Sequence, residues 1–198
     1  MNDPRLALRH IYDHIEWDRS HASYTFGFLL PGLIAAHRCK TIIEIGIADA
    51  FTTNVIGLSL ARLYDPEEAT LLSCDNTESA CKRAEAVLAP LYIGHRVHHQ
   101  DSHTMDWKKA LAEVGKHHAD MVLIDGSHQY EVVRQDIDRT RRVLRTRGLM
   151  VLHDYAPEYP GVLNAVNEFQ AQAHWRELFI PYEPDSASSP SIILQRCQ

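Results

Sequence analysis

Two short apolar segments of this 198-residue chain are each followed by an acid and a histidine. Asp125 and His128 follow the first segment, and His153 and Asp154 follow the second. Carboxylates and imidazoles are the side chains that bind divalent cations and exchange protons near neutral pH. If these four residues meet in the folded chain, they form a site for metal binding or for general acid–base chemistry.

The elements around these residues predict that they do meet. Residues 121–124 and 149–152 are continuously apolar, which is typical of buried parallel strands covered by helices on both faces. The charged stretch between them, residues 130–147, is long enough for one crossover helix. A right-handed strand–helix–strand unit brings both carboxyl ends to the same edge of the sheet, where open α/β sheets bind ligands. We therefore expect one shared site.

Strands and helices alternate along the chain from residue 41 onward, over five units. The predicted strands are residues 41–45, 71–74, 96–99, 121–124 and 149–152, and the predicted helices are residues 52–63, 78–88, 106–114, a segment within 130–147, and 161–173. Residues 175–181 and 191–195 predict two closing strands with no helix between them, hence an antiparallel hairpin. The expected fold class is α/β, with a doubly wound, mostly parallel seven-stranded sheet and a C-terminal antiparallel hairpin.

Composition narrows the classes of partner. The chain has a net charge of −6 and no Lys/Arg block, so we expect no nucleic-acid partner. Its N-terminus has no signal-peptide pattern, and the apolar stretch 26–36 contains Pro31 and is too short to span a bilayer, so we expect no membrane partner. The four cysteines, Cys39, Cys74, Cys81 and Cys197, show no CxxC spacing. Free thiols and a cytoplasmic location are the expectation.

The loop after the first predicted strand is a candidate ligand-binding turn. Glu44 lies near the strand end, Gly46, Ala48 and Ala50 follow, and Thr52 begins the helix. Small residues let backbone approach a ligand at a helix N-terminus, where free N–H groups favour polar or anionic atoms. The loop lacks the Gly-Lys-Ser/Thr of a P-loop, and its alanines make a poor dinucleotide fingerprint. A tight turn without a ligand is the alternative.

Two further strand ends carry polar pairs. Asp75 and Asn76 follow the second predicted strand, at a position suited to bind ribose hydroxyls. Asp101 and Ser102 follow the third and can reach an adenine. Together with the first and fourth strands, four successive strands end at or near an acid. Acids around a nucleoside, without a phosphate-binding lysine, suit a ligand with positive charge, such as the sulfonium S-adenosylmethionine.

The motifs resemble a known family. Residues 40–198 resemble the class I S-adenosylmethionine-dependent methyltransferases, including their terminal hairpin. The sequences Ile-Asp-Gly-Ser-His-Gln-Tyr-Glu at 124–131 and His-Asp-Tyr at 153–155 resemble the branch of sugar and small-molecule O-methyltransferases related to the macrocin and catechol enzymes. Ala50 replaces the usual second glycine of the loop. The resemblance implies that the cofactor is bound by Glu44, Gly46, Ala48, Thr52, Asp75, Asn76, Asp101, Ser102 and Asp125.

The resemblance also implies a divalent cation, with magnesium as the expected ion. In catechol-type enzymes the cation binds two acceptor oxygens, and the matching ligand positions here are Asp125, His153 and Asp154. Catechol-type enzymes carry an acid where this chain has His153, and a hard cation prefers oxygen ligands. The alternatives are that His153 hydrogen-bonds a ligand, or that the metal is manganese, iron or zinc. The acids can also serve as strand-end caps.

His128 and Asp125 are the expected catalytic residues. His128 occupies the position of a catalytic lysine in the catechol-type enzymes and of a histidine in the macrocin-type ones. An imidazole titrates near neutrality and can remove a proton from an acceptor hydroxyl. The alternative is a structural role in capping the following helix.

The segment before the sheet, residues 1–39, resembles a helical cap over the acceptor. Two helices are expected there, over residues 4–16 and about 24–38, and they suggest a homodimer interface by analogy. The aromatic residues and the histidine of this segment can line the acceptor site, or alternatively pack in the core; they are Trp17, His21, Tyr24, Phe26 and Phe28. The expected function is metal-assisted O-methylation of a small hydroxylated acceptor. The alternatives are a cephalosporin hydroxylase-like metal enzyme and a catalytically silent cofactor-binding module.

Overall fold

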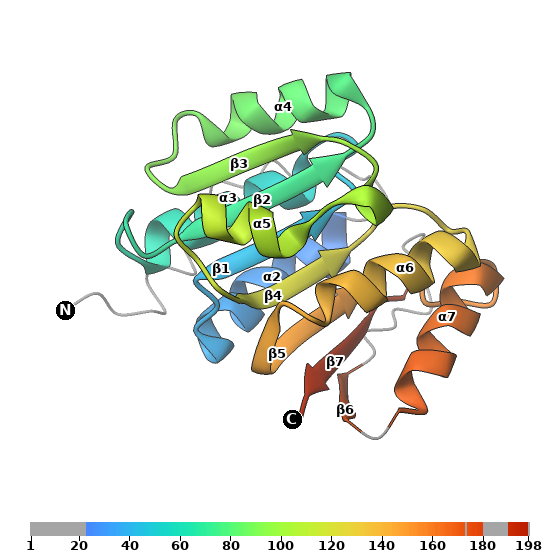
Figure 1. Cartoon of the computed structure of the whole chain (residues 1–198). Coiled ribbons are helices and arrows are strands. Elements are labelled where there is room, and N and C mark those ends of the chain that lie inside the picture. Colours follow the sequence, from blue (N-terminus) through green and yellow to red (C-terminus); the bar gives the residue numbers. More distant parts are fainter. Residues whose placement is uncertain (1–22, 173, 180–189, 198) are drawn as a thin grey trace.

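Seven strands form a single sheet in the order β3-β2-β1-β4-β5-β7-β6 (Figure 1). The computed structural model describes residues 23–172, 174–179 and 190–197. The strands are β1 (Thr41–Ile45), β2 (Thr70–Asp75), β3 (Gly94–His99), β4 (Ala119–Ile124), β5 (Leu144–Leu152), β6 (Trp175–Phe179) and β7 (Ile192–Arg196). The first five are parallel, whereas β7 pairs antiparallel with both β5 and β6. The predicted fold class is confirmed.

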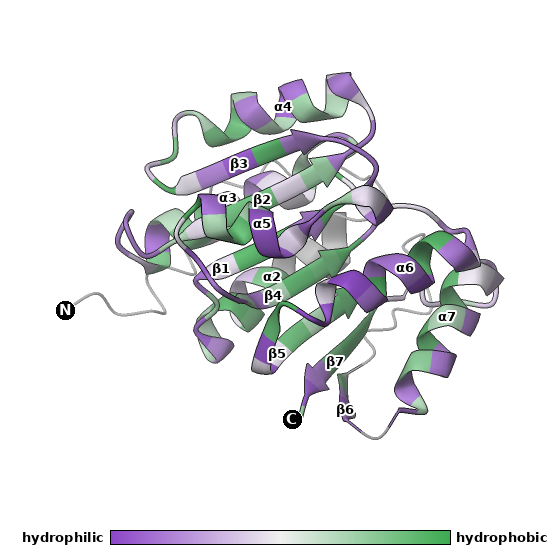
Figure 2. Cartoon of the chain, in the orientation of Figure 1, coloured by the Kyte–Doolittle hydropathy of each residue, from purple (hydrophilic) through white to green (hydrophobic). Residues whose placement is uncertain are grey.

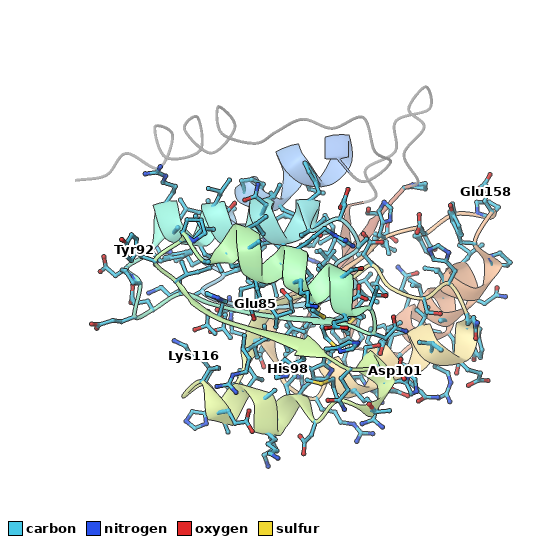
Figure 3. The ribbon with its side chains drawn as sticks, turned by 90° about the horizontal axis from the view of Figure 1, so that it is seen from above. Glu85, Tyr92, His98, Asp101, Lys116 and Glu158 are labelled. Carbon is cyan, nitrogen blue, oxygen red and sulfur yellow. The ribbon has the colours of Figure 1, made fainter. Side chains whose placement is uncertain are left out.

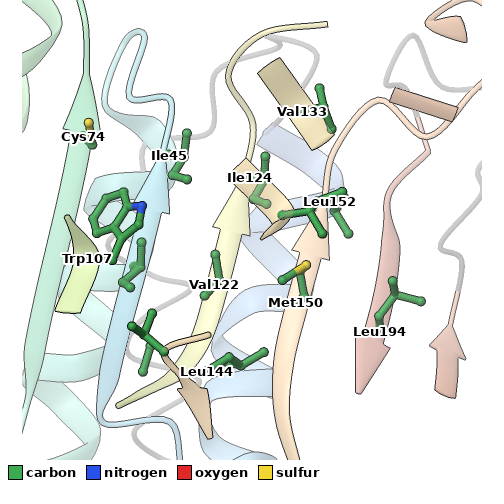
Figure 4. Close-up of a cluster of buried hydrophobic side chains, with 14 of the residues drawn as sticks. Ile45, Cys74, Trp107, Val122, Ile124, Val133, Leu144, Met150, Leu152 and Leu194 are labelled. Atoms are coloured by element: carbon green, nitrogen blue, oxygen red, sulfur yellow. The ribbon is translucent and has the colours of Figure 1, made fainter. Parts of the chain in front are cut away.

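Helices cover both faces of the sheet. They are α2 (Ser23–His37), α3 (Phe51–Leu63), α4 (Glu78–Leu88), α5 (Trp107–Glu113), α6 (Tyr130–Thr140) and α7 (Pro160–Gln170), with a 3₁₀ turn, η1 (Ser102–Thr104). One buried cluster joins the sheet to α5, α6 and α7 (Figure 4), and a second joins it to α2, α3 and α4. Alternate residues of each central strand enter opposite clusters, as Ile42 and Ile43 do. This arrangement explains why these strands are apolar throughout.

Strand boundaries differ from the prediction where the sequence is polar. β5 begins at Leu144, five residues before the expected apolar run at Leu149, because its exposed residues 146–147 give no apolar signal. β3 lies at the edge of the sheet and is hydrophilic along most of its length, whereas β4 is mostly hydrophobic (Figure 2). An edge strand has one neighbouring strand, and the exposed side chains of β3 carry no alternating apolar pattern.

The described part of the N-terminal segment belongs to the main core. Leu30 and Ile34 of α2 are fully buried and pack in the same cluster as α3. The expected helix at 4–16, with Trp17 and His21, lies outside the described residues, as does most of the loop between β6 and β7. Among the described helices, none has the length and apolar character needed to cross a bilayer. All four cysteines are free thiols, as predicted.

Candidate functional site

The carboxyl ends of β1 and β4 approach each other closely at the point where the strand order reverses. The Asp125 N–H donates to the Ile45 carbonyl over 2.8 Å, and the Gly46 N–H donates to the Cys74 carbonyl over 2.9 Å. Gly46 has φ +88°, and a Cβ built there would lie 2.0 Å from the Asp125 carbonyl oxygen. Only glycine fits this position, because the backbone conformation is left-handed and the neighbouring strand occupies the space of a side chain.

A cavity of about 500 Å³ opens above this junction. Its volume is in the range of small-molecule and cofactor sites. Most of the residues predicted to bind the cofactor line it, and they are Gly46, Ala48, Asp75, Asn76, Asp101, Ser102 and Asp125. Figure 3 shows Asp101 near the end of the sheet where this cavity lies and Lys116 near the opposite end. The predicted convergence of strand ends is therefore present in the structure.

Glu44 and Thr52 do not line the cavity. Glu44 is fully buried, and its carboxylate accepts hydrogen bonds from Thr52 (2.7 Å), Thr53 (2.8 Å) and Ser73 (2.6 Å). Burial raises the pKa of Glu44 to about 7, although the three hydroxyl donors oppose this rise. In this structure Glu44 and Thr52 join β1 to α3 and β2, so their predicted contact with the cofactor is replaced by a structural interaction.

Asp75 lines the cavity and also holds the loop after β1. One carboxylate oxygen accepts the N–H groups of Ile47 (2.9 Å) and Ala48 (3.3 Å), and the other accepts the N–H of Thr77 (2.7 Å). Partial burial raises the pKa of Asp75, but these backbone donors outweigh it and hold the pKa below its usual value. Asn76 donates to Asp101 over 3.2 Å, which links the ends of β2 and β3. These contacts keep a carboxylate ionised at the cavity wall.

The two acid–histidine strand ends form one cluster. His153 Nδ1 lies 3.0 Å from Asp125 Oδ1 and 3.2 Å from Asp154 Oδ1, while His128 Nε2 lies 2.7 Å from Asp154 Oδ2. His153 and Asp154 are both buried, with 6% of each residue exposed. Burial lowers the pKa of His153, but hydrogen bonds and charge from Asp125 and Asp154 outweigh it and raise the pKa to about 9. The predicted meeting of the four side chains is confirmed.

Three of these side chains have the composition of a metal site. Asp125, His153 and Asp154 each offer a ligand atom, and these atoms all lie within 4.8 Å of one another. Two carboxylates with one imidazole form a donor set that divalent cations accept. Asp154 has φ +58°, a left-handed conformation that is uncommon for a residue other than glycine. The donor set therefore fits a cation, and His153 belongs to it geometrically.

His128 lies beside the main cavity. It lines a second cavity of about 10 Å³ together with His153 and Asp154, and Asp125 lines both cavities. The ring of Tyr159 packs against the His128 ring with 4.4 Å between centroids. Gly161, in the first turn of α7, lies so close that a Cβ there would be 2.1 Å from the His128 carbonyl oxygen. The position of His128 thus depends on α7.

Several lining residues were not predicted. Thr77, His103, Ser127 and Gln129 line the main cavity. Each lies within a few residues of a predicted strand end, and this position along the chain is the sequence feature from which its place in the cavity could have been predicted. Tyr159 had no such signal, because its contact with His128 arises from the packing of α7 against the loop before α6.

The fold and the site define the class of protein. A doubly wound sheet with a closing antiparallel hairpin and a cavity at the strand-order reversal is the class I methyltransferase architecture. A family model described as a methyltransferase domain matches residues 43–155, more than half of the chain, and the chain belongs to this family. The class expected from the motifs is therefore confirmed. A search of curated proteins gave no match.

Solved structures show the same fold. An O-methyltransferase from Bacillus cereus in complex with SAH is 14% identical, with a TM-score of 0.67 over 99% of this chain and 92% of that chain. The O-methyltransferase TomG from Streptomyces achromogenes, involved in tomaymycin synthesis and solved with SAM, is 15% identical, with a TM-score of 0.69 over 100% and 92%. CalS11, a TDP-rhamnose 3′-O-methyltransferase of calicheamicin biosynthesis, is 12% identical, with a TM-score of 0.67 over 98% and 96%.

The buried carboxyl of Glu44 predicts a pH-dependent stability. With a pKa of about 7 when folded and an ordinary pKa when unfolded, Glu44 makes the folded chain bind more protons between about pH 4.5 and 7. Its contribution to stability therefore falls as pH rises through this window, by roughly 3 kcal/mol. Urea unfolding of the wild type and Glu44→Gln at pH 5 and pH 8 measures the difference, in which the other titrating groups cancel. Equal pH dependence in the two proteins would contradict this assignment.

The close approach at Gly161 predicts a large effect of a small substitution. Gly161→Ala places a Cβ against the backbone of His128 and Tyr130, so we expect a loss of roughly 1–3 kcal/mol in the free energy of unfolding. Gly32→Ala is the matched control, because no heavy atom lies within 4 Å of the Cβ that alanine would add there, and alanine is favoured in a helix. Urea denaturation of both variants measures the free energy of unfolding, and an unchanged midpoint for Gly161→Ala would contradict the close packing of α7 against His128.

Proposed function

We propose that this methyltransferase uses S-adenosylmethionine to methylate an oxygen of a small hydroxylated molecule, with a divalent cation at the acid–histidine cluster. The observation that carries the proposal is that a cavity of nucleoside-binding size shares Asp125 with that cluster. A donor in the large cavity would thus lie beside residues able to bind a cation and accept a proton. Oxygen-directed relatives of the same fold, one solved with SAM and one with SAH, support this choice of donor.

Negative charge lines the donor side. Asp75, Asp101 and Asp125 all face the cavity, and among the described residues no lysine or arginine lines it. This distribution favours a ligand with sulfonium and ammonium groups over one with phosphates. We propose that Asp75 and Asn76, at the end of β2, bind the ribose hydroxyls, and that Asp101 and Ser102 contact the base.

The acceptor side supplies proton transfer. In the reaction, an oxygen lone pair of the acceptor forms the new C–O bond as the C–S bond breaks and its electron pair stays on sulfur. We propose that His128 takes the hydroxyl proton. The Asp154 carboxylate accepts a hydrogen bond from His128 Nε2, which leaves Nδ1 as the nitrogen that can accept a proton. Tyr159 packs against the ring and limits its rotation.

Asp125, His153 and Asp154 would hold the cation. The chemistry that a divalent cation supplies at such a site is positive charge, which favours ionisation of a nearby hydroxyl group. These three residues also fix one another: Asp125 and Asp154 both contact His153 Nδ1. Magnesium is our proposed ion, since two carboxylates from adjacent strands leave room for water and acceptor oxygens.

A second candidate is a transition-metal enzyme on the same fold, of the cephalosporin hydroxylase-like kind. The observation that favours it is His153, because an imidazole between two carboxylates suits manganese, iron or zinc better than magnesium. Tight binding of such a metal without binding of S-adenosylmethionine would select this second function.

Calorimetry with S-adenosylmethionine, with and without magnesium, tests the donor and the cation separately. We expect one molecule of donor to bind, and the cation to bind more tightly when both Asp125 and Asp154 are intact. Asp154→Asn should weaken cation binding by about tenfold or more while donor binding persists, because Asp154 lies away from the main cavity. Absence of donor binding under both conditions would contradict the proposed function.

The role of His128 is tested by His128→Ala. We expect turnover to fall by about a hundredfold or more, with little change in affinity for S-adenosylhomocysteine. The assay follows S-adenosylhomocysteine release with a panel of sugars and phenols, using the acceptor that the wild type methylates. His117→Ala, an exposed histidine before β4, is the control and should behave as wild type. A parallel loss of product affinity in His128→Ala would indicate a structural role.

A further inference from the structure

The loop between β1 and α3, residues 46–50, contains three residues in the left-handed conformation. They are Gly46 (φ +88°), Ala48 (φ +48°) and Ala50 (φ +67°). Glycine adopts such dihedrals readily, but in alanine the Cβ crowds the carbonyl oxygen and disfavours them. The two alanines therefore hold a conformation that the loop sequence alone does not favour. Within the loop the Ala50 N–H donates to the Ile47 carbonyl over 2.8 Å, and contacts from outside the loop add to this turn.

Two side chains from other elements fix the peptide groups on either side of Ala48. The Ala48 N–H donates to Asp75 Oδ2 over 3.3 Å, and the preceding N–H of Ile47 donates to the same oxygen over 2.9 Å. The Ala48 carbonyl accepts two hydrogen bonds from Arg83, from Nε at 3.0 Å and from Nη2 at 2.6 Å. Because the N–H and the C=O of one residue are both held, its φ and ψ are both fixed.

Helix α4 supports the loop by packing as well. Ile47 and Ala50 are buried against Ala80, Cys81 and Ala84 of this helix. Arg83 lies between Cys81 and Ala84 in the sequence but is exposed, and its guanidinium group contacts the loop at Ala48. The planar guanidinium group of arginine presents two N–H donors to one carbonyl oxygen. A lysine ammonium group at the same place would not reproduce this geometry.

We propose that Arg83 is a positioning residue that preforms the loop lining the donor cavity. Arg83 does not line that cavity, whereas Gly46 and Ala48 do. Without the two hydrogen bonds, Ala48 is free to relax toward negative φ, and the peptide that faces the cavity rotates with it. Ligand binding must then restore the left-handed conformation. The apparent affinity therefore falls in proportion to the fraction of molecules that still hold this conformation before binding. The effect on the donor rests on the proposed function, but the effect on the loop does not.

Hydrogen exchange of the ligand-free protein tests the loop directly. In Arg83→Ala we expect the amides of Ala48 and Ala50 to exchange about tenfold faster than in the wild type, because the loop opens more often. Lys82→Ala is the matched control: it removes a cation from the neighbouring position, whose partner is Glu78 on the same helix. The control should leave these amides unchanged, and both variants should keep the wild-type unfolding midpoint. Equal exchange in Arg83→Ala and the wild type would overturn the proposal.

Binding tests the functional consequence. We expect Arg83→Ala to weaken S-adenosylhomocysteine by about fivefold to tenfold in calorimetry. This product has no net charge from its sulfur, so loss of a cation does not itself favour binding. In turnover, KM for the donor should rise while kcat stays unchanged. Ala48→Gly should rescue the variant, because glycine adopts the left-handed conformation without the two Arg83 hydrogen bonds, which we call the clamp. In the Ala48→Gly background, Arg83→Ala should therefore reduce affinity by less than about twofold.

The outcomes separate the two hypotheses. Faster loop exchange in Arg83→Ala, together with a wild type that binds no S-adenosylhomocysteine, would support the clamp and reject the proposed donor. Donor binding that is equally strong in Arg83→Ala and in the wild type would overturn the positioning role. If Arg83→Ala loses as much affinity in the Ala48→Gly background as in the native one, Arg83 acts by another route and the clamp is rejected.

Discussion

The approach of β1 to β4 at Gly46 is the constraint on which the site depends. The Asp125 N–H binds the carbonyl of Ile45, and no side chain fits between the two strand ends. Beyond this junction the chain turns toward α3 on one face of the sheet and toward α6 on the other. The divergence of these two connections opens the cavity, as expected where strand order reverses. Asp125, held at the junction, becomes a wall of both the cavity and the acid–histidine cluster.

The acids near the strand ends have different roles because they lie at different distances from the edge of the sheet. Asp75 and Asp125 lie at or just after the last strand residue and face the cavity. Glu44 lies one residue before the end of β1, so the alternation of the strand directs it to the opposite face from Ile45, toward α3. There three hydroxyl groups donate hydrogen bonds to its carboxylate, so that Glu44 joins β1 to α3 and β2. A difference of one position separates a structural acid from a ligand-facing one.

The sequence predicted the sheet and most of the cavity because both follow from apolar strands and the residues after them. Met121 and Leu149 lie in strands that pair in register, which brings Asp125 and His153 together as expected. What the sequence did not predict depends on contacts between distant elements. The start of β5 has polar residues, and Tyr159 meets His128 only because Gly161 lets α7 approach. The contact of Thr52 with a buried acid likewise required the three-dimensional arrangement.

Three of the five described residues other than glycine that adopt a left-handed conformation lie on the two sides of the site. Ala48 and Ala50 lie on the donor side, and Asp154 lies on the side of the proposed acceptor. Such conformations persist where surrounding contacts over-determine them. On the donor side those contacts are Asp75 and Arg83, and at Asp154 they include His128 and His153. The ligand atom that Asp154 offers lies within 4.8 Å of the one that Asp125 offers. A left-handed residue other than glycine that lies shortly after a strand end, with side chains in contact with it, is therefore common to both halves of the site.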